Sequence, residues 1–414
     1  MSELSSADPY KGVRDFYPTD WAKQEAMYAC IRQTLALWGY EEYNASPLER
    51  AELYEAKTSE EIVNEQTYTF TDRGDRRVTL RPEMTPTLAR MVAAKRRELI
   101  YPLRWFSIGN RFRYERPQKG RLREFYQADI DLVGLPEGEA DIEIVRLASE
   151  ILKAFGATEK DFVIRINSRS LLNAACKSAG LKGDAVRQYL RLLDKKSKMT
   201  SEAFTEARNT ISATDPLSFI EQKAMETFIT TLKTRGVGTA VFDPSITRGF
   251  DYYTGMVFEV YDTNSTNPRA LFGGGRYDNL ISLWPSGGGE PVPAVGFALG
   301  DVTLADFLET HALMPNVNAG TSQLYLGTPS PNDIPSAQSF AETLRKEGAR
   351  IFVNLTDRAL GDQIKDAVRR GIPLFVAYVA DEVANTAVRL KTLATGEEAT
   401  LPSSELPQRL RSGR

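Results

Sequence analysis

The sequence of 414 residues predicts an α+β protein followed by a small α/β unit. Residues 104–134 have the pattern of strand, loop and strand with alternating side chains, and segments of helical periodicity flank them. After residue 322, strands and helices alternate in the order βαβαβ, which implies a parallel sheet. Length alone favours two or three domains. We expect one domain at residues 1–322 and a second at 323–414.

The elements before residue 168 are predicted from periodicity and from start and stop signals. A first helix is expected at 20–38, after Pro18 and Thr19 and before Gly39. A second is expected at 86–99, with three basic residues in its last turn, where they suit the helix dipole. A third helix at 139–156 and a strand at 162–166 follow.

Residues 168–238 change character and predict a helical insertion. Short helices are expected at 171–179, 183–193 and 216–234, with no strong strand. Strands return at 237–243 and 251–261, and a helical stretch is expected after the glycines at 273–275. Residues 311–321 are rich in Pro, Asn and Gly, which is typical of a linker.

Composition excludes several classes of chemistry. His311 is the single histidine, so Ser-His-Asp and HExxH arrangements are unsupported. The two cysteines, Cys30 and Cys176, form no CxxC pair, and we expect no metal held by the protein. Carboxylates, Arg, Lys, Tyr or a carried ion must therefore supply any catalysis.

No membrane or export signal is present in the sequence. It contains no run of about 18 apolar residues, and its first residues lack the basic and apolar regions of a signal peptide. We expect a cytoplasmic protein without a membrane partner.

Within the predicted hairpin, residues 104–123 are strongly basic, with seven Arg and Lys against one acidic residue, Glu115. The formal net charge is −3, from 52 Lys and Arg against 55 Asp and Glu. Alternation places Arg113, Gln127 and Asp131 on one face and mainly apolar side chains on the other. Such a face is either solvated or the floor of a cleft, where guanidinium groups bind phosphate or carboxylate. The loop at 116–121 is equally a flexible turn or a clamp for phosphates.

Three further segments carry side chains suited to a site. Arg248 opens RGFDYYTG, where Tyr252 and Tyr253 are predicted on opposite faces of a strand, so that only one lines a cleft. The glycines of GGGRYD (273–278) match no phosphate loop and favour a strand-to-helix turn. Glu83, in LRPEMTP, either binds an ammonium group or caps the helix that follows, which is the more common use.

Taken in order, these segments resemble class II histidyl-tRNA synthetases over nearly the whole chain. TYTFTDR (67–73) with LRPE resembles the early catalytic segment, and FRYERPQKGRLREFYQ (112–127) resembles motif 2 with its loop. RGFDYYTG and GGGRYD resemble the two signatures of the histidine enzymes, and PAVGFALG (293–300) resembles the start of motif 3. The C-terminal unit resembles the family's anticodon-binding domain.

The resemblance implies a fold, substrates and partners. The fold is the class II antiparallel catalytic sheet of six strands flanked by helices, with a helical insertion, in a homodimer. The activity is histidyl-tRNA synthesis, in which ATP with bound Mg²⁺ activates L-histidine and the adenylate is transferred to the 3′ end of histidine tRNA. Adenylate formation needs positioning and charge neutralisation and no protein nucleophile.

The resemblance also implies roles for individual residues. Arg113 and Arg248 are the expected catalytic residues, at the α-phosphate, with Glu115 joining them in ATP binding. The residues expected to bind histidine are Glu83, Thr85, Gln127, Asp131, Tyr252 and Tyr253. The residues expected near the tRNA acceptor end are Arg116, Gln118 and Arg121. No role is assigned to His311 or to the insertion.

One position departs from the family pattern. Motif 3 commonly continues as GLERL, whose arginine contacts ATP, whereas this chain has GDVTL with Thr303 at that place. Either another cation takes over, from the 115–117 segment or from Arg276, or ATP binding is impaired. The rival hypothesis is a catalytically silent regulatory subunit of ATP phosphoribosyltransferase. The intact RGFDYYTG, the basic loop and the C-terminal unit favour the enzyme, and a threonyl enzyme would show zinc ligands.

Overall fold

The computed structural model describes residues 7–55, 66–196, 199–248, 251–284, 289–317, 322–379 and 387–412. Contacts divide the chain into two compact units, residues 1–15 with 24–315 and residues 16–23 with 316–414. Helix α1 (Pro18–Leu37) contributes its residues from Gln24 onward to the first unit. Within the described ranges, no helix has both the length and the apolar character needed to cross a membrane.

An eight-stranded mixed sheet is the centre of the first unit. Its six inner strands run antiparallel to their neighbours, which confirms the expected antiparallel sheet, and a short parallel strand extends each edge. In spatial order the strands are β1 (Glu41–Glu42), β5 (Leu103–Phe112), β6 (Glu124–Val133), β11 (Ala294–Gly300), β10 (Ala270–Arg276), β9 (Met256–Asp262), β7 (Phe162–Ser168) and β8 (Ala240–Phe242).

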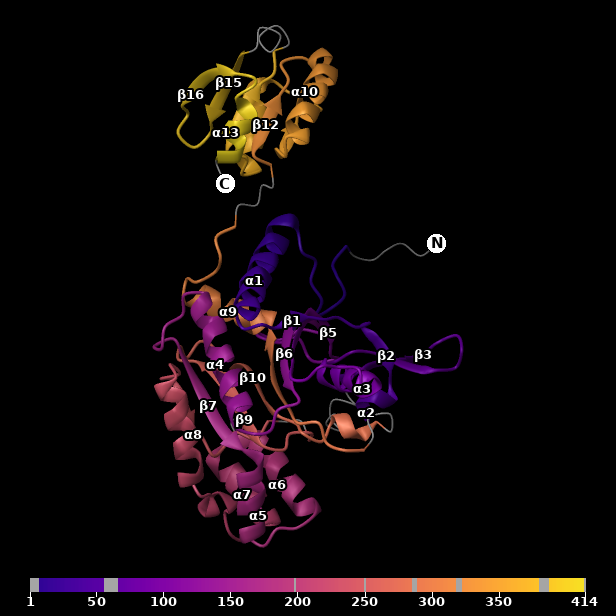
Figure 1. Ribbon diagram of the computed structural model, residues 1–414, viewed down its shortest axis with the longest axis vertical. Helices are drawn as coiled ribbons and strands as arrows, with labels where there is room; N and C mark the ends of the chain where they lie inside the picture. Colours follow the sequence, from indigo (N-terminus) through magenta and orange to yellow (C-terminus); the bar gives the residue numbers. More distant parts are fainter. Residues whose placement is uncertain are drawn as a thin grey trace. The chain divides into compact units, whose positions relative to one another are not determined.

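Helices cover one face of this sheet, and the candidate site lies on the opposite face. Ile144 and Val145 of α4 (Glu139–Ala154) join Ile130 and Phe258 of the strands in one buried core. Helices α8 (Lys223–Thr234) and α9 (Asp301–Thr310) pack into the same core, and Figure 1 shows α4 and α8 beside the strands. Burial of these apolar side chains is the main term that holds helices and sheet together.

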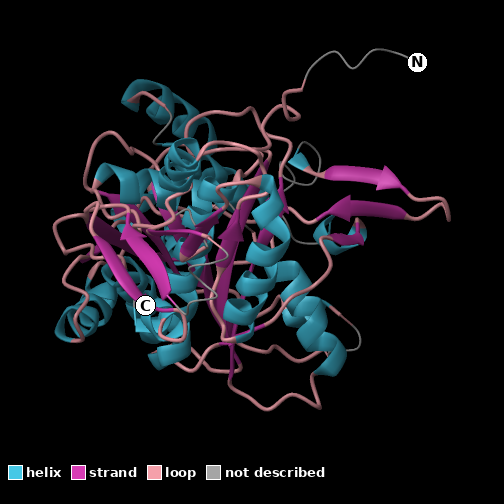
Figure 2. Ribbon diagram, turned by 90° about the horizontal axis from the view of Figure 1, so that it is seen from above, coloured by secondary structure: helices cyan, strands magenta, loops and turns pink. Residues whose placement is uncertain are grey.

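A smaller three-stranded antiparallel sheet lies between β1 and β5 of the main sheet in the sequence. It has the order β2 (Leu48–Arg50), β4 (Arg77–Leu80), β3 (Tyr68–Thr71). Strands β3 and β4 project from the rest of the first unit as a two-stranded arm (Figures 1 and 2). Helix α2 (Glu52–Glu55) lies between β2 and β3 in the sequence, and β4 leads through a short turn into helix α3 (Thr85–Lys95).

The glycines at 273–275 lie inside β10, so the predicted strand-to-helix turn is wrong. A Cβ at Gly273 would stand 2.4 Å from the carbonyl oxygen of Phe258, and one at Gly274 would stand 2.0 Å from that of Gly296. The neighbouring backbones of β9 and β11 approach too closely for a side chain. In place of the expected helical stretch, the short 3₁₀ helix η4 (Ile281–Leu283) follows the strand.

The predicted helical insertion is confirmed in its described part. Three helices, the 3₁₀ helix η3 (Pro216–Phe219) and α8 form it. The three helices and η3 bury a small core of their own, whereas α8 packs into the main core. The sequence did not predict α7, in which Phe204 is the buried residue and the Thr200 hydroxyl caps the first turn. The three helices are α5 (Arg169–Ser178), α6 (Asp184–Asp194) and α7 (Ser201–Ile211).

The second unit contains a five-stranded mixed sheet. Strands β13 (Ile351–Val353), β12 (Leu324–Gly327) and β14 (Leu374–Ala377) are parallel, which confirms the predicted βαβαβ order. Two antiparallel strands that were not predicted, β15 (Ala387–Thr392) and β16 (Glu398–Pro402), extend it. The helices are α10 (Ile334–Lys346), α11 (Leu360–Arg369) and α13 (Leu406–Ser412), with the 3₁₀ helix η6 (Pro331–Asp333) before α10.

Candidate active site

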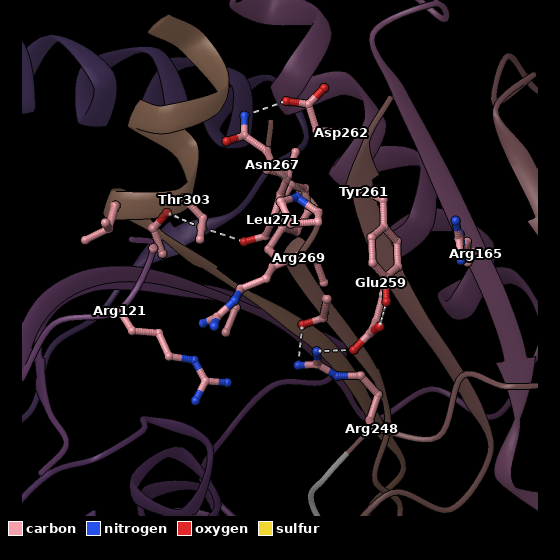
Figure 3. A pocket seen from close by; sticks show the side chains of 18 of the residues that line it. Arg121, Arg165, Arg248, Glu259, Tyr261, Asp262, Asn267, Arg269, Leu271 and Thr303 are labelled. Atoms are coloured by element: carbon pink, nitrogen blue, oxygen red, sulfur yellow. Dashed lines mark hydrogen bonds and ion pairs between the residues drawn. The ribbon is translucent and has the colours of Figure 1, made fainter. Parts of the chain in front are cut away.

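Two cavities share a wall on the face of the main sheet opposite the helical core. The larger has a volume of about 1020 Å³ and is drawn in Figure 3. The smaller has a volume of about 100 Å³. Residues that line both are Arg113, Gln127, Arg248 and Ala298. The predicted polar face of the β5–β6 hairpin is therefore the floor of a cleft.

Glu83 lies in the wall of the small cavity and does not cap a helix. It stands in the turn between β4 and α3, it is buried, and its Oε2 accepts a hydrogen bond of 3.0 Å from the Tyr252 hydroxyl. The N-cap residue of α3 is Met84, which provides no side-chain cap. The helix-cap interpretation is thus wrong, and Glu83 presents its carboxylate in the cavity, which Thr85 also lines.

Tyr252 and Tyr253 both line the small cavity, with ring centroids 4.8 Å apart. The prediction that only one could do so assumed that a strand begins at residue 251. The strand β9 begins at Met256, so the two tyrosines precede it and lack the alternation of a strand. Their neighbours Gly249 and Phe250 of RGFDYYTG lie outside the described residues.

Asp131 has a buried carboxyl group of which one oxygen is hydrogen-bonded and the other is not, within the described part of the chain. The Tyr277 hydroxyl donates to its Oδ1, whereas Oδ2 has no hydrogen-bond partner among the described residues. Burial raises the pKa of Asp131 to about 8, the Tyr277 hydrogen bond opposes this rise, and the charge of Asp129 adds to it. Gly296 faces Asp131 on β11, and a Cβ there would come within 2.1 Å of Oδ1, so the glycine makes room for the carboxylate.

A buried ion pair orients Gln127, two residues before Asp129 on β6. Arg111 donates to Oδ2 of Asp129 at 2.6 Å, and both side chains are almost completely buried. Oδ1 of Asp129 accepts a hydrogen bond of 2.7 Å from Nε2 of Gln127. The amide nitrogen of Gln127 is thereby engaged, and its oxygen is left as an acceptor in the shared wall of the two cavities.

Arg113 and Arg248 are the two cations at the junction of the cavities. Nε of Arg113 donates to the Pro82 carbonyl at 2.9 Å, and its guanidinium lies 5.3 Å from the centroid of the Phe125 ring. Arg248, at a φ of +59°, is held by Glu259 at 3.0 Å and by the Gly273 carbonyl at 3.2 Å.

Arg248 keeps its charge although it is buried. Desolvation lowers the pKa of its guanidinium, but Tyr253 and Glu259 outweigh it and raise the pKa above the usual value. Two fixed positive charges therefore face the point where the cavities meet.

The predicted acceptor-end residues lie on the loop between β5 and β6, with different surroundings. Arg121 lines the large cavity and pairs with Glu115, which also lines it, at 2.8 Å. Gln118 is exposed and accepts a hydrogen bond of 2.9 Å from Arg269. Arg116 is exposed and lines neither cavity.

Arg276 is a structural residue, so its candidacy as the replacement cation is wrong. Its side chain is fully buried and binds Asp141 through two hydrogen bonds of 2.9 and 2.8 Å and Asp278 through one of 2.9 Å. It joins β10 to α4 and lines neither cavity. Thr303 does line the large cavity, where its hydroxyl donates to the Leu271 carbonyl at 2.6 Å.

Sequence reasoning missed three residues of the site. Tyr277 binds Asp131, Glu259 binds Arg248, and Arg269 points into the large cavity (Figure 3). Tyr277 belongs to GGGRYD and Glu259 to the strand expected at 251–261, and the register of β9 and β10 is needed to show which side each one faces.

His311 lies outside both cavities. It ends α9, where its Nε2 lies 2.8 Å from Asp262. In the described parts of the chain, no group of three or more His, Cys, Asp or Glu side chains is arranged to hold a metal ion.

Comparison with known proteins shows the family. A family model described as histidyl-tRNA synthetase matches residues 12–226 and 197–303, and one described as anticodon binding domain matches residues 324–413. The histidine–tRNA ligase of Leptospira biflexa is 38% identical over 98% of each chain, and that of Opitutus terrae is 37% identical over 97% of each. The crystal structure of histidyl-tRNA synthetase from Nostoc sp. PCC 7120 superposes with a TM-score of 0.76 at 24% identity, over 98% of this chain and 99% of that one, which shows the shared fold. The chain belongs to the histidyl-tRNA synthetase family.

Proposed function

We propose that this chain is a histidine–tRNA ligase that uses ATP. A carboxylate oxygen of L-histidine attacks the α-phosphorus of ATP, the bond from the α-phosphorus to the bridging oxygen breaks, and pyrophosphate leaves. A ribose hydroxyl at the 3′ end of histidine tRNA then attacks the histidyl carbonyl, and AMP leaves. One observation carries the proposal: Asp131 offers a buried, unpaired carboxylate oxygen in a small cavity that shares two arginines with a large one.

The small cavity has the chemistry of an amino-acid pocket. Asp131 and the tyrosine pair would bind the imidazole ring, because a carboxyl and hydroxyl groups supply the donors and acceptors that its two nitrogens need. Glu83 and the oxygen of Gln127 would hold the α-ammonium, with Thr85 beside them. A site built to pair polar atoms rejects analogues that lack them by roughly 10⁴-fold or more.

The junction of the cavities is the place for the reacting atoms. The amino-acid carboxylate and the α-phosphate are both anionic, so their approach requires neutralisation. Arg113 and Arg248 line both cavities and supply two fixed cations there. Mg²⁺ enters with ATP as part of the substrate, and Glu115 offers carboxylate oxygens in the large cavity, the ligand type that Mg²⁺ prefers.

The tRNA is proposed to contact both units. Arg116, Gln118 and Arg121 lie on the loop beside the large cavity and would meet the acceptor end. We assign residues 1–322 to the catalytic domain and 323–414 to the anticodon-binding domain, which the family match at 324–413 supports. The family membership also supports a homodimer that works in the cytoplasm.

The test is histidine-dependent exchange between ATP and labelled pyrophosphate, followed by charging of histidine tRNA. We expect exchange with histidine and none when another amino acid replaces it. Absence of exchange together with stimulation of an ATP phosphoribosyltransferase would establish the regulatory alternative. The two relatives named above, and further relatives that are 34–35% identical over nearly the whole chain, are histidine–tRNA ligases. This favours the enzyme over the regulatory subunit.

A further inference from the structure

The arginines that line the large cavity differ in whether a carboxylate of the protein already pairs with them. Arg248 pairs with Glu259 and Arg121 pairs with Glu115. Arg165 pairs with Asp243 at 3.2 Å, and its guanidinium lies 4.5 Å from the centroid of the Tyr261 ring. Three of the cations therefore already have a carboxylate partner.

Arg269 is held by a neutral partner instead. Its guanidinium donates to the amide oxygen of Gln118 at 2.9 Å, and no carboxylate among the described residues lies within ion-pair distance of it. A phosphate oxygen that replaces this amide would gain a full charge interaction without breaking an ion pair. Arg269 is therefore an exposed cation that is ready to bind an anion.

The fold holds Arg269 at the edge of the cavity. The residue stands one position before β10, at the end of a loop in which Asp262 accepts hydrogen bonds of 2.7 Å from the backbone of Asn264 and the side chain of Asn267. Lys119 donates to the Thr266 carbonyl at 3.3 Å, which is a second contact between this loop and the loop of Gln118. Figure 3 shows Arg121, Arg248 and Arg269 directed into the same space.

The two cavities also define which part of ATP would meet this side chain. Arg113 and Arg248 line both cavities, and the α-phosphate belongs at their junction. Arg121 and Arg269 line only the large cavity, which has to hold the rest of ATP. As cations they suit its anionic β- and γ-phosphates and not the neutral adenosine. Thr303 lines the same cavity where the family commonly has an arginine, and its hydroxyl is bound to the Leu271 carbonyl, two residues from Arg269.

We propose that Arg269 binds the β- and γ-phosphates of ATP and supplies the nucleotide contact that Thr303 cannot make. This role rests on the proposed function. A planar guanidinium can form two parallel hydrogen bonds with phosphate oxygens, which a threonine hydroxyl cannot replace.

The first experiment measures pyrophosphate exchange with Arg269→Ala. We expect KM for ATP to rise by about 10- to 100-fold, the loss expected for a hydrogen bond between charged groups, with KM for histidine unchanged. Arg269→Lys should recover part of the loss because it keeps the charge. Arg187→Ala, which removes an exposed arginine that lines neither cavity, is the matched control and should behave as the unaltered chain.

A binding measurement separates phosphate recognition from a structural role. By calorimetry, Arg269→Ala should weaken a non-hydrolysable α,β-methylene analogue of ATP and leave the affinity for AMP unchanged. Equal weakening of both nucleotides, or an unchanged KM for ATP in the active variant, would overturn the role of Arg269. Absence of histidine-dependent exchange in the unaltered chain would instead overturn the proposed function, so the two failures are distinct.

Discussion

At the scale of single residues, Arg248 carries the sharpest prediction about catalysis. Its charge is fixed at the junction of the cavities. The proposed function places the attack on the α-phosphorus, where negative charge develops, at this junction. Arg248→Ala should lower the rate of pyrophosphate exchange by about 10²-fold or more while histidine still binds, since loss of one preorganised donor has costs of this size. Stopped-flow or steady-state exchange combined with histidine titration measures both quantities.

The control for Arg248 addresses the charge it leaves behind. Removal of the guanidinium leaves Glu259 without its ion-pair partner in the cavity wall, and an unpaired buried carboxylate destabilises a fold by itself. The double variant Arg248→Ala with Glu259→Gln removes that charge and should show the same loss of exchange. Exchange within about twofold of the unaltered chain in the folded double variant would contradict the catalytic role of Arg248.

Asp131 predicts how stability depends on pH. The pKa of its carboxyl is about 8 in the folded chain, above the usual value of about 3.9. Between these values the folded state holds a proton that the unfolded state has released, so stability falls as pH rises through this window. Thermal unfolding across the window should show the unaltered chain losing stability relative to Asp131→Asn, which has no such proton. Parallel profiles for the two proteins would show that the carboxyl does not titrate in this way.

Residue-level prediction from the sequence succeeded where alternation decides which way a side chain faces. Gln127 and Asp131 were placed on one face of a strand, and both line the small cavity. It failed where a residue lies just outside a strand, as for Tyr252 and Tyr253. It also failed for Arg276, because nothing in its own segment reveals that Asp141, far away in the sequence, neutralises it.

At the scale of elements, the glycines of β10 carry a prediction about stability. Gly274→Ala would place a Cβ 2.0 Å from the Gly296 carbonyl oxygen and 2.6 Å from Cα of Phe297, both backbone atoms of the adjacent strand. Because backbone cannot move aside as a flexible side chain can, we expect a loss of about 3 kcal/mol or more in the free energy of unfolding, measured with denaturant.

Gly300→Ala is the matched control in the same unit. Its φ is −81°, and the Thr303 hydroxyl, 3.7 Å away, is the near atom that a Cβ would meet. The variant should stay within about 1 kcal/mol of the unaltered chain. If both variants lose the same stability, close approach of the strands does not explain the glycines of β10.

The sequence predicted those helices and strands whose own apolar residues recur at a clear period. It did not predict features that depend on packing against another element. Helix α4 was expected because its apolar residues recur at helical spacing and its packing follows from that stripe. Helix α7 has a polar sequence that buries Phe204, so periodicity gave no signal. The glycines of β10 are required by the close approach of β9 and β11. The sequence of one segment does not show which distant strands will pair with it.

At the scale of the whole molecule, the division of work between two units gives the last prediction. The proposed function assigns adenylate formation to the two cavities, whose lining residues all lie between 83 and 303. Residues 324–413, in contrast, match an anticodon binding domain. Removal of residues 323–414 should therefore reduce kcat/KM for tRNA in charging by at least about 10²-fold, since the binding energy of a second site is lost, and reduce exchange far less. The truncated chain must first show cooperative unfolding. Equal loss of charging and exchange in a folded truncation would mean that the second unit supports the catalytic site itself, and an anticodon-binding role would then not account for the result.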